Sequence, residues 1–106
     1  MITPQMHIEL ITKVHVPRAI RRFAALCDDE KEFQEFLGLA NRVEAQPTLE
    51  NLELARVALH DKAHRVARTS PMMSAAAHNG AYVCAAGYSA LEIWRELKAV
   101  ENHQWS

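Results

Sequence analysis

Three histidines in the second half of the sequence have the residue type and spacing to bind a metal ion. His60 and His64 are four residues apart, so on a helix their imidazoles lie one turn apart on the same side. His64 lies six residues before Ser70, and His78 lies seven residues after Pro71. If the chain reverses direction at Ser70-Pro71, His78 reaches the level of His64 on the neighbouring helix. The sequence therefore offers His60, His64 and His78 as a candidate metal or small-ligand site.

The histidine pattern is an incomplete match to known metal motifs. A zincin helix needs a glutamate directly after its first histidine, and Asp61 stands there instead. A histidine near small residues is more often hydrogen-bonded to a neighbouring group than bound to a metal, so structural histidines are the favoured interpretation. A Cys84–His78 nucleophile pair is set aside, because six residues on one helix put the two on different faces.

The sequence holds no motif of an enzyme. It lacks a Gly-rich phosphate loop and a serine in a nucleophile elbow. We therefore predict no catalytic residue and no cofactor.

Two charged clusters are candidates for contact with a partner. They are Arg18, Arg21 and Arg22, and the run Asp28, Asp29 and Glu30. The basic cluster could contact a phosphate or an acidic partner, and the acidic run could dock a basic protein. Solvated faces of amphipathic helices have the same appearance, so either cluster could instead face only water.

Composition predicts that helices position these side chains. The chain is 49% hydrophobic but only 7% aromatic, and its three glycines and four prolines are too few for the turns of a β sandwich. One hydrophobic core is expected for 106 residues. We predict an all-α fold, a compact bundle of four or five helices with short connections, forming a single domain over residues 1–106.

Periodic apolar residues and capping signals give the expected helices. One helix is expected to have Pro17 in its first turn, and a second to cover the segment with Phe33 and Val43. A third is expected to begin after the N-cap Thr48, and a fourth to run from about Pro71 to Glu101. Residues 7–16 alternate in polarity but have no partner strand, so we interpret this N-terminal stretch as a short helix or an extended arm.

Particular positions within these helices carry further expectations. Gly38 weakens its helix and is expected to mark a close helix crossing. Lys62 is assigned to the solvated side of the third helix. In the last helix, Leu91, Trp94 and Leu97 are expected to continue the core face.

Small residues line the first half of the last helix. Two rows recur at four-residue spacing: Ala76, Gly80 and Cys84, and Ala77, Ala81, Ala85 and Ser89. Such rows let a neighbouring backbone approach closely, so we expect them to be pressed against other helices. The same rows could instead form the interface of a homodimer.

Charge and hydropathy restrict the partners. Twelve Lys and Arg against thirteen Asp and Glu give a net charge of -1, so a nucleic-acid partner is not expected. No apolar run reaches the roughly 18 residues of a membrane span, and no secretory signal is seen, so we expect a cytoplasmic protein without a membrane partner. Cys27 and Cys84 are expected to be buried free thiols.

The second half of the chain resembles a known family. From Thr48 onward it has a capped helix reading Leu-Ala-Arg-Val-Ala-Leu-His, a break with proline, and an Ala-rich helix with His-Asn-Gly. This order resembles the alanine- and histidine-rich immunity proteins of bacterial polymorphic toxin systems. The matching positions, which span about half of the chain, are His60, Pro71, Ala76, Ala77, His78, Ala81, Ala85 and Ala86.

The resemblance implies an all-α protein that binds and neutralises a cognate toxin, and it transfers no catalytic residue. The leading hypothesis is therefore a small non-enzymatic helical binding protein, such as an immunity or inhibitor protein. The alternative is a metal- or ligand-binding helical domain that uses the three histidines.

Overall fold

Helices make up nearly all of residues 1–105, which are the residues that the computed structural model describes; side chains are described as far as Glu101. The elements are α1 (Pro4–Leu10), the π-helical segment η1 (Ile11–His15), α2 (Val16–Ala24), α3 (Glu30–Ala45), α4 (Leu49–Val66) and α5 (Pro71–Trp105). Residues 1–105 contain no strand. The predicted all-α bundle is confirmed.

The N-terminal segment is one continuous helical rod, α1–η1–α2, and Pro17 lies in the first turn of α2 as expected. Proline lacks an N–H and its ring clashes with the carbonyl four residues earlier, which would break an α-helix at Lys13. The chain widens into π geometry just before the proline, and the Val16 N–H donates to the Ile11 carbonyl, five residues back. The wide turn lets the helix continue through Pro17, so residues 4–16 are helical.

Side-chain caps set the helix starts where the sequence indicates them. Thr3 Oγ1 accepts from the Met6 N–H at 3.1 Å and begins α1, and Thr48 Oγ1 accepts from the Asn51 N–H at 3.1 Å and begins α4. At the α4–α5 turn, Ser70 Oγ accepts from the N–H of Met73 at 3.4 Å. Each cap satisfies a backbone donor that has no partner inside its helix.

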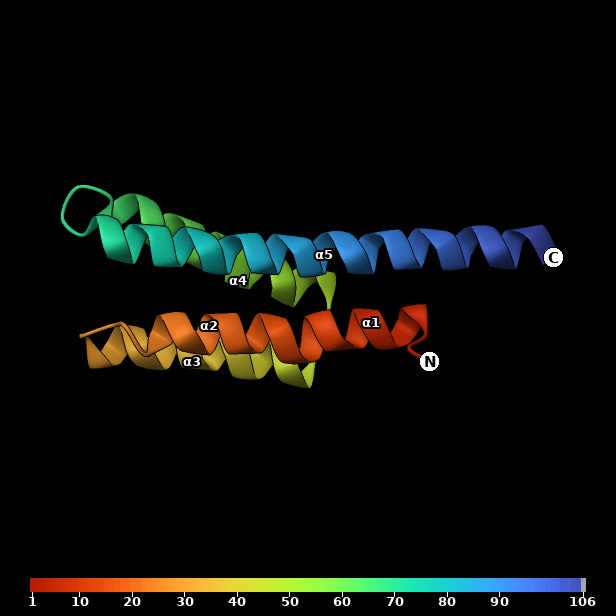
Figure 1. Cartoon of the computed structure of the whole chain (residues 1–106), viewed down its shortest axis with the longest axis horizontal. Coiled ribbons are helices and arrows are strands. Elements are labelled where there is room, and N and C mark those ends of the chain that lie inside the picture. Colours follow the sequence, from red (N-terminus) through yellow and green to blue (C-terminus); the bar gives the residue numbers. More distant parts are fainter. Residues whose placement is uncertain (106) are drawn as a thin grey trace.

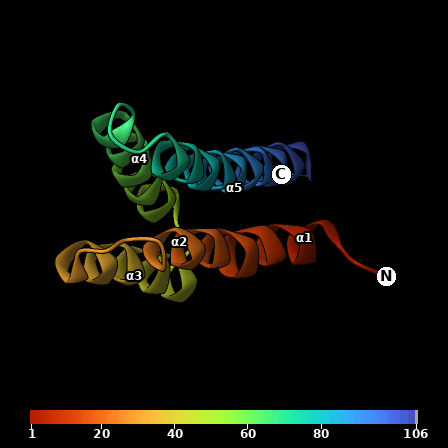
Figure 2. The ribbon, with the colours of Figure 1, turned by 60° about the vertical axis from the view of Figure 1, so that its left-hand side comes forward.

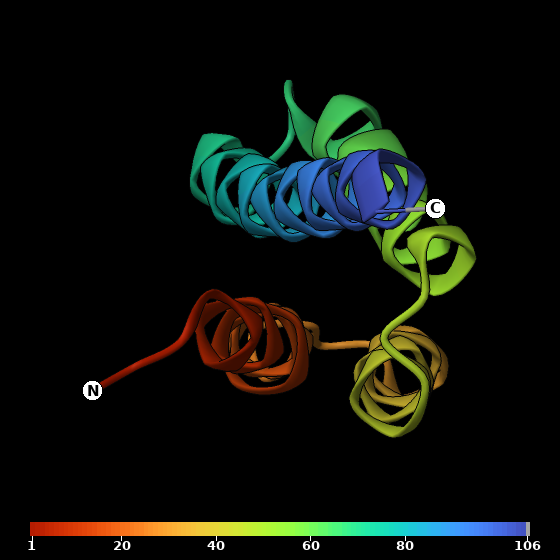
Figure 3. The ribbon, with the colours of Figure 1, turned by 90° about the vertical axis from the view of Figure 1, so that its right-hand side faces the viewer.

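The four rods run alternately up and down. Figure 1 shows α1–α2 beside α3 in one layer and α4 beside α5 in the other, and the end view in Figure 3 places the rods around a common centre. In Figure 2 α4 is visibly inclined to α5. The molecule measures 55 × 24 × 22 Å because α5 continues past the end of the bundle.

The core forms where all four rods meet. Its buried apolar residues are Val16, Ile20, Phe23, Ala24, Phe36, Ala40, Val43, Leu52, Ala55, Leu59, Ala63, Ala77, Ala81 and Cys84. The Phe23 and Phe36 rings pack edge to face with centres 4.9 Å apart and join α2 to α3. Most of these residues lie on the apolar faces expected from the sequence.

The expectation that the small residues of α5 are pressed against its neighbours is confirmed for Ala77, Gly80, Ala81 and Cys84, which are buried, but not for Ser89, which is exposed. A side-chain carbon added at Gly80 would lie 3.1 Å from Leu59 Cδ1 of α4, and one added at Gly87 would lie 2.9 Å from Val16 Cγ2 of α2. These glycines let α5 sit close to both layers. The expectation for Gly38 is wrong: nothing lies within 4 Å of its missing side chain, so that glycine faces open space.

Candidate functional site

The α4–α5 hairpin brings the three predicted histidines together. His60 and His64 of α4 have their Nε2 atoms 3.2 Å apart and their ring centres 4.4 Å apart. The His78 ring of α5 has its centre 5.8 Å from that of His60 and 5.5 Å from that of His64. The rings meet edge to face, with interplanar angles between 68° and 83°. We call these three side chains the histidine cluster.

Packing directly beneath the histidine cluster fixes the register of the two helices. Leu59 and Ala63, each one residue before a cluster histidine, are fully buried. Leu59 fits against Gly80, and the Ser74 hydroxyl donates to the Ala63 carbonyl at 2.8 Å in the buried interface. A one-residue slip of α5 would break both contacts, so the core itself places His78 opposite the α4 pair.

The histidine cluster lies at the surface. His60 and His64 are exposed and His78 is half-buried. A pocket of about 270 Å³ beside His60 and His78 is also lined by Arg56 and Tyr82. The Arg56 guanidinium is engaged by Glu53, whose two carboxylate oxygens accept from Nε at 3.1 Å. This pairing raises the pKa of Arg56 and lowers that of Glu53.

The present side-chain rotamers do not form a finished metal centre. Among the described residues, no three His, Cys, Asp or Glu side chains already have donor atoms arranged to hold one ion. In the histidine cluster, the α4 pair faces nitrogen to nitrogen and the third ring lies alongside. As placed, the cluster is a hydrogen-bonded pair of α4 with the His78 ring of α5 beside it.

The three arginines of the predicted basic cluster have different surroundings in the structure. Arg21 donates through Nη1 to Glu44 Oε2 and through Nη2 to Asn41 Oδ1, each at 2.9 Å, and so ties α2 to α3. The hydrogen bond raises the pKa of Arg21 and lowers that of Glu44. Arg18 and Arg22 are exposed. Two of the three arginines therefore remain open to a partner.

The predicted acidic cluster lies at the start of α3. Asp29 Oδ1 accepts from the Lys31 N–H at 3.2 Å as the N-cap, and Glu30 Oε1 accepts from the Gln34 side chain at 3.0 Å. Asp28 lies in the preceding turn and is exposed. Acidic groups here favour the positive end of the helix dipole, so this run has a structural role in starting α3.

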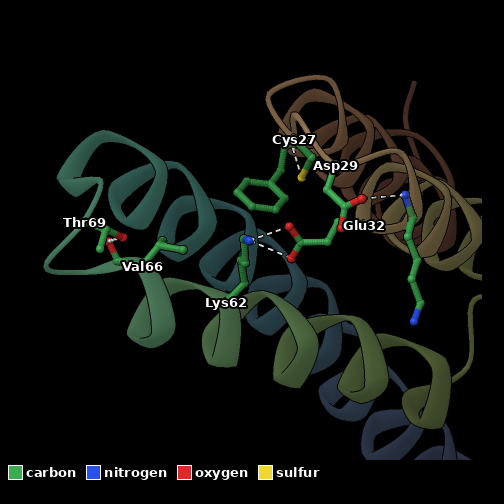
Figure 4. A network of polar contacts seen from close by, with 8 residues as sticks. Cys27, Asp29, Glu32, Lys62, Val66 and Thr69 are labelled. Atoms are coloured by element: carbon green, nitrogen blue, oxygen red, sulfur yellow. Dashed lines mark hydrogen bonds and ion pairs between the residues drawn. The ribbon is translucent and has the colours of Figure 1, made fainter.

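An ion pair between α3 and α4 was missed from the sequence. Lys62, expected to be solvated, is buried, and its Nζ donates to both carboxylate oxygens of Glu32 at 2.7 and 2.6 Å. Figure 4 shows the pair between the two helices, close to Cys27 and the Asp29 cap. Lys62 follows Ala55 by seven and Leu59 by three residues, so heptad spacing within the buried stripe was the available signal.

An apolar groove between α1 and α5 is a second feature that the sequence did not reveal. It has a volume of about 350 Å³ and is lined by Pro4, His7, Ile8, Ala90, Ile93, Trp94 and Leu97. We call it the α1–α5 groove. Leu97 was expected in the core, but it is exposed because the bundle ends before it: at this end α1 and α5 extend past α3 and α4 (Figure 1).

The two cysteines differ in burial. Cys84 is fully buried as expected, and burial raises its pKa to about 12. Cys27 is half-buried, so the expectation of a buried thiol is only partly met; desolvation and the nearby Glu32 raise its pKa. Both are free thiols.

Comparisons with protein-family models, with curated proteins and with solved structures found no match to this chain. Within its described residues, none of the helices combines the length and the apolar character that crossing a membrane requires.

Proposed function

We propose that this chain is a small, non-enzymatic, cytoplasmic binding protein, and that an amphipathic helix of a partner protein binds in the α1–α5 groove. One observation carries the proposal. Ile93, Leu97 and Val100 recur at helical spacing along α5 and are 55%, 57% and 59% exposed, beside a groove lined by apolar residues. Regularly spaced apolar side chains without a neighbour are typical of a binding surface.

The geometry of the groove favours a helix as its occupant. Four rods surround the core in the body of the bundle, whereas at this end only α1 and α5 lie side by side. A third helix can pack its side-chain ridges into the furrow between them, as in helix-in-groove recognition. Its apolar residues at positions i, i+4 and i+7 would cover Ile93 and Leu97.

The resemblance of residues 48–91 to immunity proteins supports a different protein, and not a second copy, as the partner. More specifically, we propose that the chain inhibits a cognate toxin by covering part of the toxin's surface. Arg18 and Arg22 of α2 are the competing surface, because both are exposed and neither forms an ion pair in the described part of the chain.

The test uses purified chain and purified partner, the first candidate being the product of the neighbouring gene. Leu97→Asp places a charge in the α1–α5 groove, and Met72→Asp, at an exposed position near the start of α5, is the matched control. Because truncating an anchor residue typically costs about 2 kcal/mol or more, we expect affinity to fall at least about thirtyfold for Leu97→Asp. Met72→Asp should bind like the parent chain.

Three outcomes would overturn the proposal. Equal affinity of Leu97→Asp and the parent chain would exclude the groove. Loss of binding in an Arg18→Ala/Arg22→Ala variant alone would move the surface to α2. A parent chain that dimerises on its own across a dilution series in light scattering, with Leu97→Asp monomeric, would make a second copy the occupant.

A further inference from the structure

We propose that the histidine cluster binds one divalent transition-metal ion, with Zn²⁺ as the reference ion. Histidine nitrogens bound to tetrahedral zinc lie at about 2.0–2.1 Å from the metal, which puts two of them about 3.3 Å apart. The Nε2 atoms of His60 and His64 are 3.2 Å apart. The α4 pair therefore already has the spacing of two ligands on one ion.

The third ring has the spacing of a third ligand. A ring centre lies about 1.1 Å beyond its coordinating nitrogen, so the centres of imidazoles sharing a tetrahedral ion are about 5 Å apart. The observed separations are 4.4, 5.5 and 5.8 Å. The three ring centres therefore have roughly the spacing of imidazoles around one ion, but the donor atoms as placed do not hold one, so His78 has to turn a nitrogen inward.

The surroundings of the cluster allow that turn. His78 is half-buried and borders the 270 Å³ pocket, which leaves space for its imidazole to rotate and for a water molecule as fourth ligand. The nearest pocket cation, Arg56, is compensated by Glu53, so its repulsion of a bound ion is reduced. Three protein ligands and one open position is the usual composition of a zinc site that is not purely structural.

The chemistry of the donors restricts the ion. The cluster offers imidazole nitrogen, which suits Zn²⁺, Ni²⁺, Co²⁺ and Cu²⁺, whereas Mg²⁺ and Ca²⁺ require oxygen ligands. A hydrogen bond from one Nε2 to the other would also explain the short distance within the α4 pair. That hydrogen bond would not involve His78, which belongs to α5. Removing His78 therefore distinguishes a metal site from a hydrogen-bonded histidine pair.

Binding to purified full-length chain, with any affinity tag removed, tests the proposal. We expect one Zn²⁺ per chain in calorimetry, a melting temperature that rises with Zn²⁺, and no effect of Mg²⁺. His78→Ala should weaken Zn²⁺ binding at least about tenfold, because even loss of an outer partner of a ligand has that effect. His15→Ala, which removes an exposed histidine of η1, is the matched control and should bind like the parent chain.

Two results would overturn the proposal. One is no stoichiometric Zn²⁺ binding by the parent chain. The other is equal affinity of His78→Ala and the parent chain, which would leave only an ordinary helical histidine pair. His64→Gln provides a second variant at an exposed position, so an unfolded His78→Ala would not prevent a decision: unchanged Zn²⁺ affinity in His64→Gln would also contradict the site.

Discussion

Replacing Lys62 by methionine tests the ion pair that joins the two layers of the bundle. Methionine keeps most of the volume and the apolar stem of lysine but removes its charge. Lys62 Nζ lies 2.7 and 2.6 Å from the two oxygens of Glu32, and the two side chains are 10% and 22% exposed (Figure 4). Lys62→Met therefore leaves a carboxylate without its partner in a largely dry interface.

The expected cost lies between two known limits. Exposed pairs contribute about 0.2–1 kcal/mol, and removing one partner of a fully buried pair costs about 3–5 kcal/mol. Since Glu32 keeps about a fifth of its exposure and can recover some water, we expect Lys62→Met to lower the free energy of unfolding by about 2 kcal/mol. For a domain of this size that corresponds to a melting temperature lower by roughly 10 °C.

A double-mutant cycle in urea unfolding measures the interaction. Glu32→Leu alone should also destabilise, because it leaves the lysine charge unpaired, whereas Lys62→Met/Glu32→Leu removes both charges and should recover most of the loss. A loss below about 0.5 kcal/mol for Lys62→Met, the range of a surface substitution, would refute the reasoning. Additive single and double variants would refute it as well.

The glycines and Cys84 provide further predictions. Gly87→Ala should destabilise the chain by about 1–3 kcal/mol because the added carbon clashes with Val16. Gly38→Ala should stabilise it by up to about 1 kcal/mol, because Gly38 lies in a helix with open space around it. Equal effects of the two substitutions in thermal unfolding would disprove the close contact of α5. Burial raises the pKa of the Cys84 thiol to about 12, whereas the thiol of the unfolded chain ionises above about pH 9. The contribution of this thiol to the free energy of unfolding is therefore complete below pH 9. It is lost as the pH rises further, by at most about 1.4 kcal/mol per pH unit. Cys84→Ala should therefore have a flatter stability profile between pH 8 and 10, and identical slopes would contradict this origin.

The sequence predicted those parts of the structure that depend on local spacing. The histidine cluster followed from counting residues on either side of the Ser70-Pro71 turn, because two helices joined by a short turn advance at the same rise per residue. The caps at Thr48 and Ser70 were predictable for a similar reason, since a cap needs only its own helix.

Features that depend on which helices meet were not predictable in this way. Lys62 looked like a surface residue until α3 brought Glu32 to it, and Leu97 looked like a core residue until the bundle ended before it. The π turn before Pro17 was missed, because such a turn leaves no recognisable pattern of residue types. In each case tertiary contacts or backbone geometry overrode a sound local rule.

Hydrogen exchange along α5, with and without the purified partner, tests the proposed function most directly. Amides from Ile93 to Val100 should exchange rapidly in the free chain, where the helix projects past the bundle, and slow down when the partner occupies the α1–α5 groove. Unchanged exchange in this segment upon binding, with protection instead at Arg18–Arg22 or Asp28–Glu30, would contradict the account.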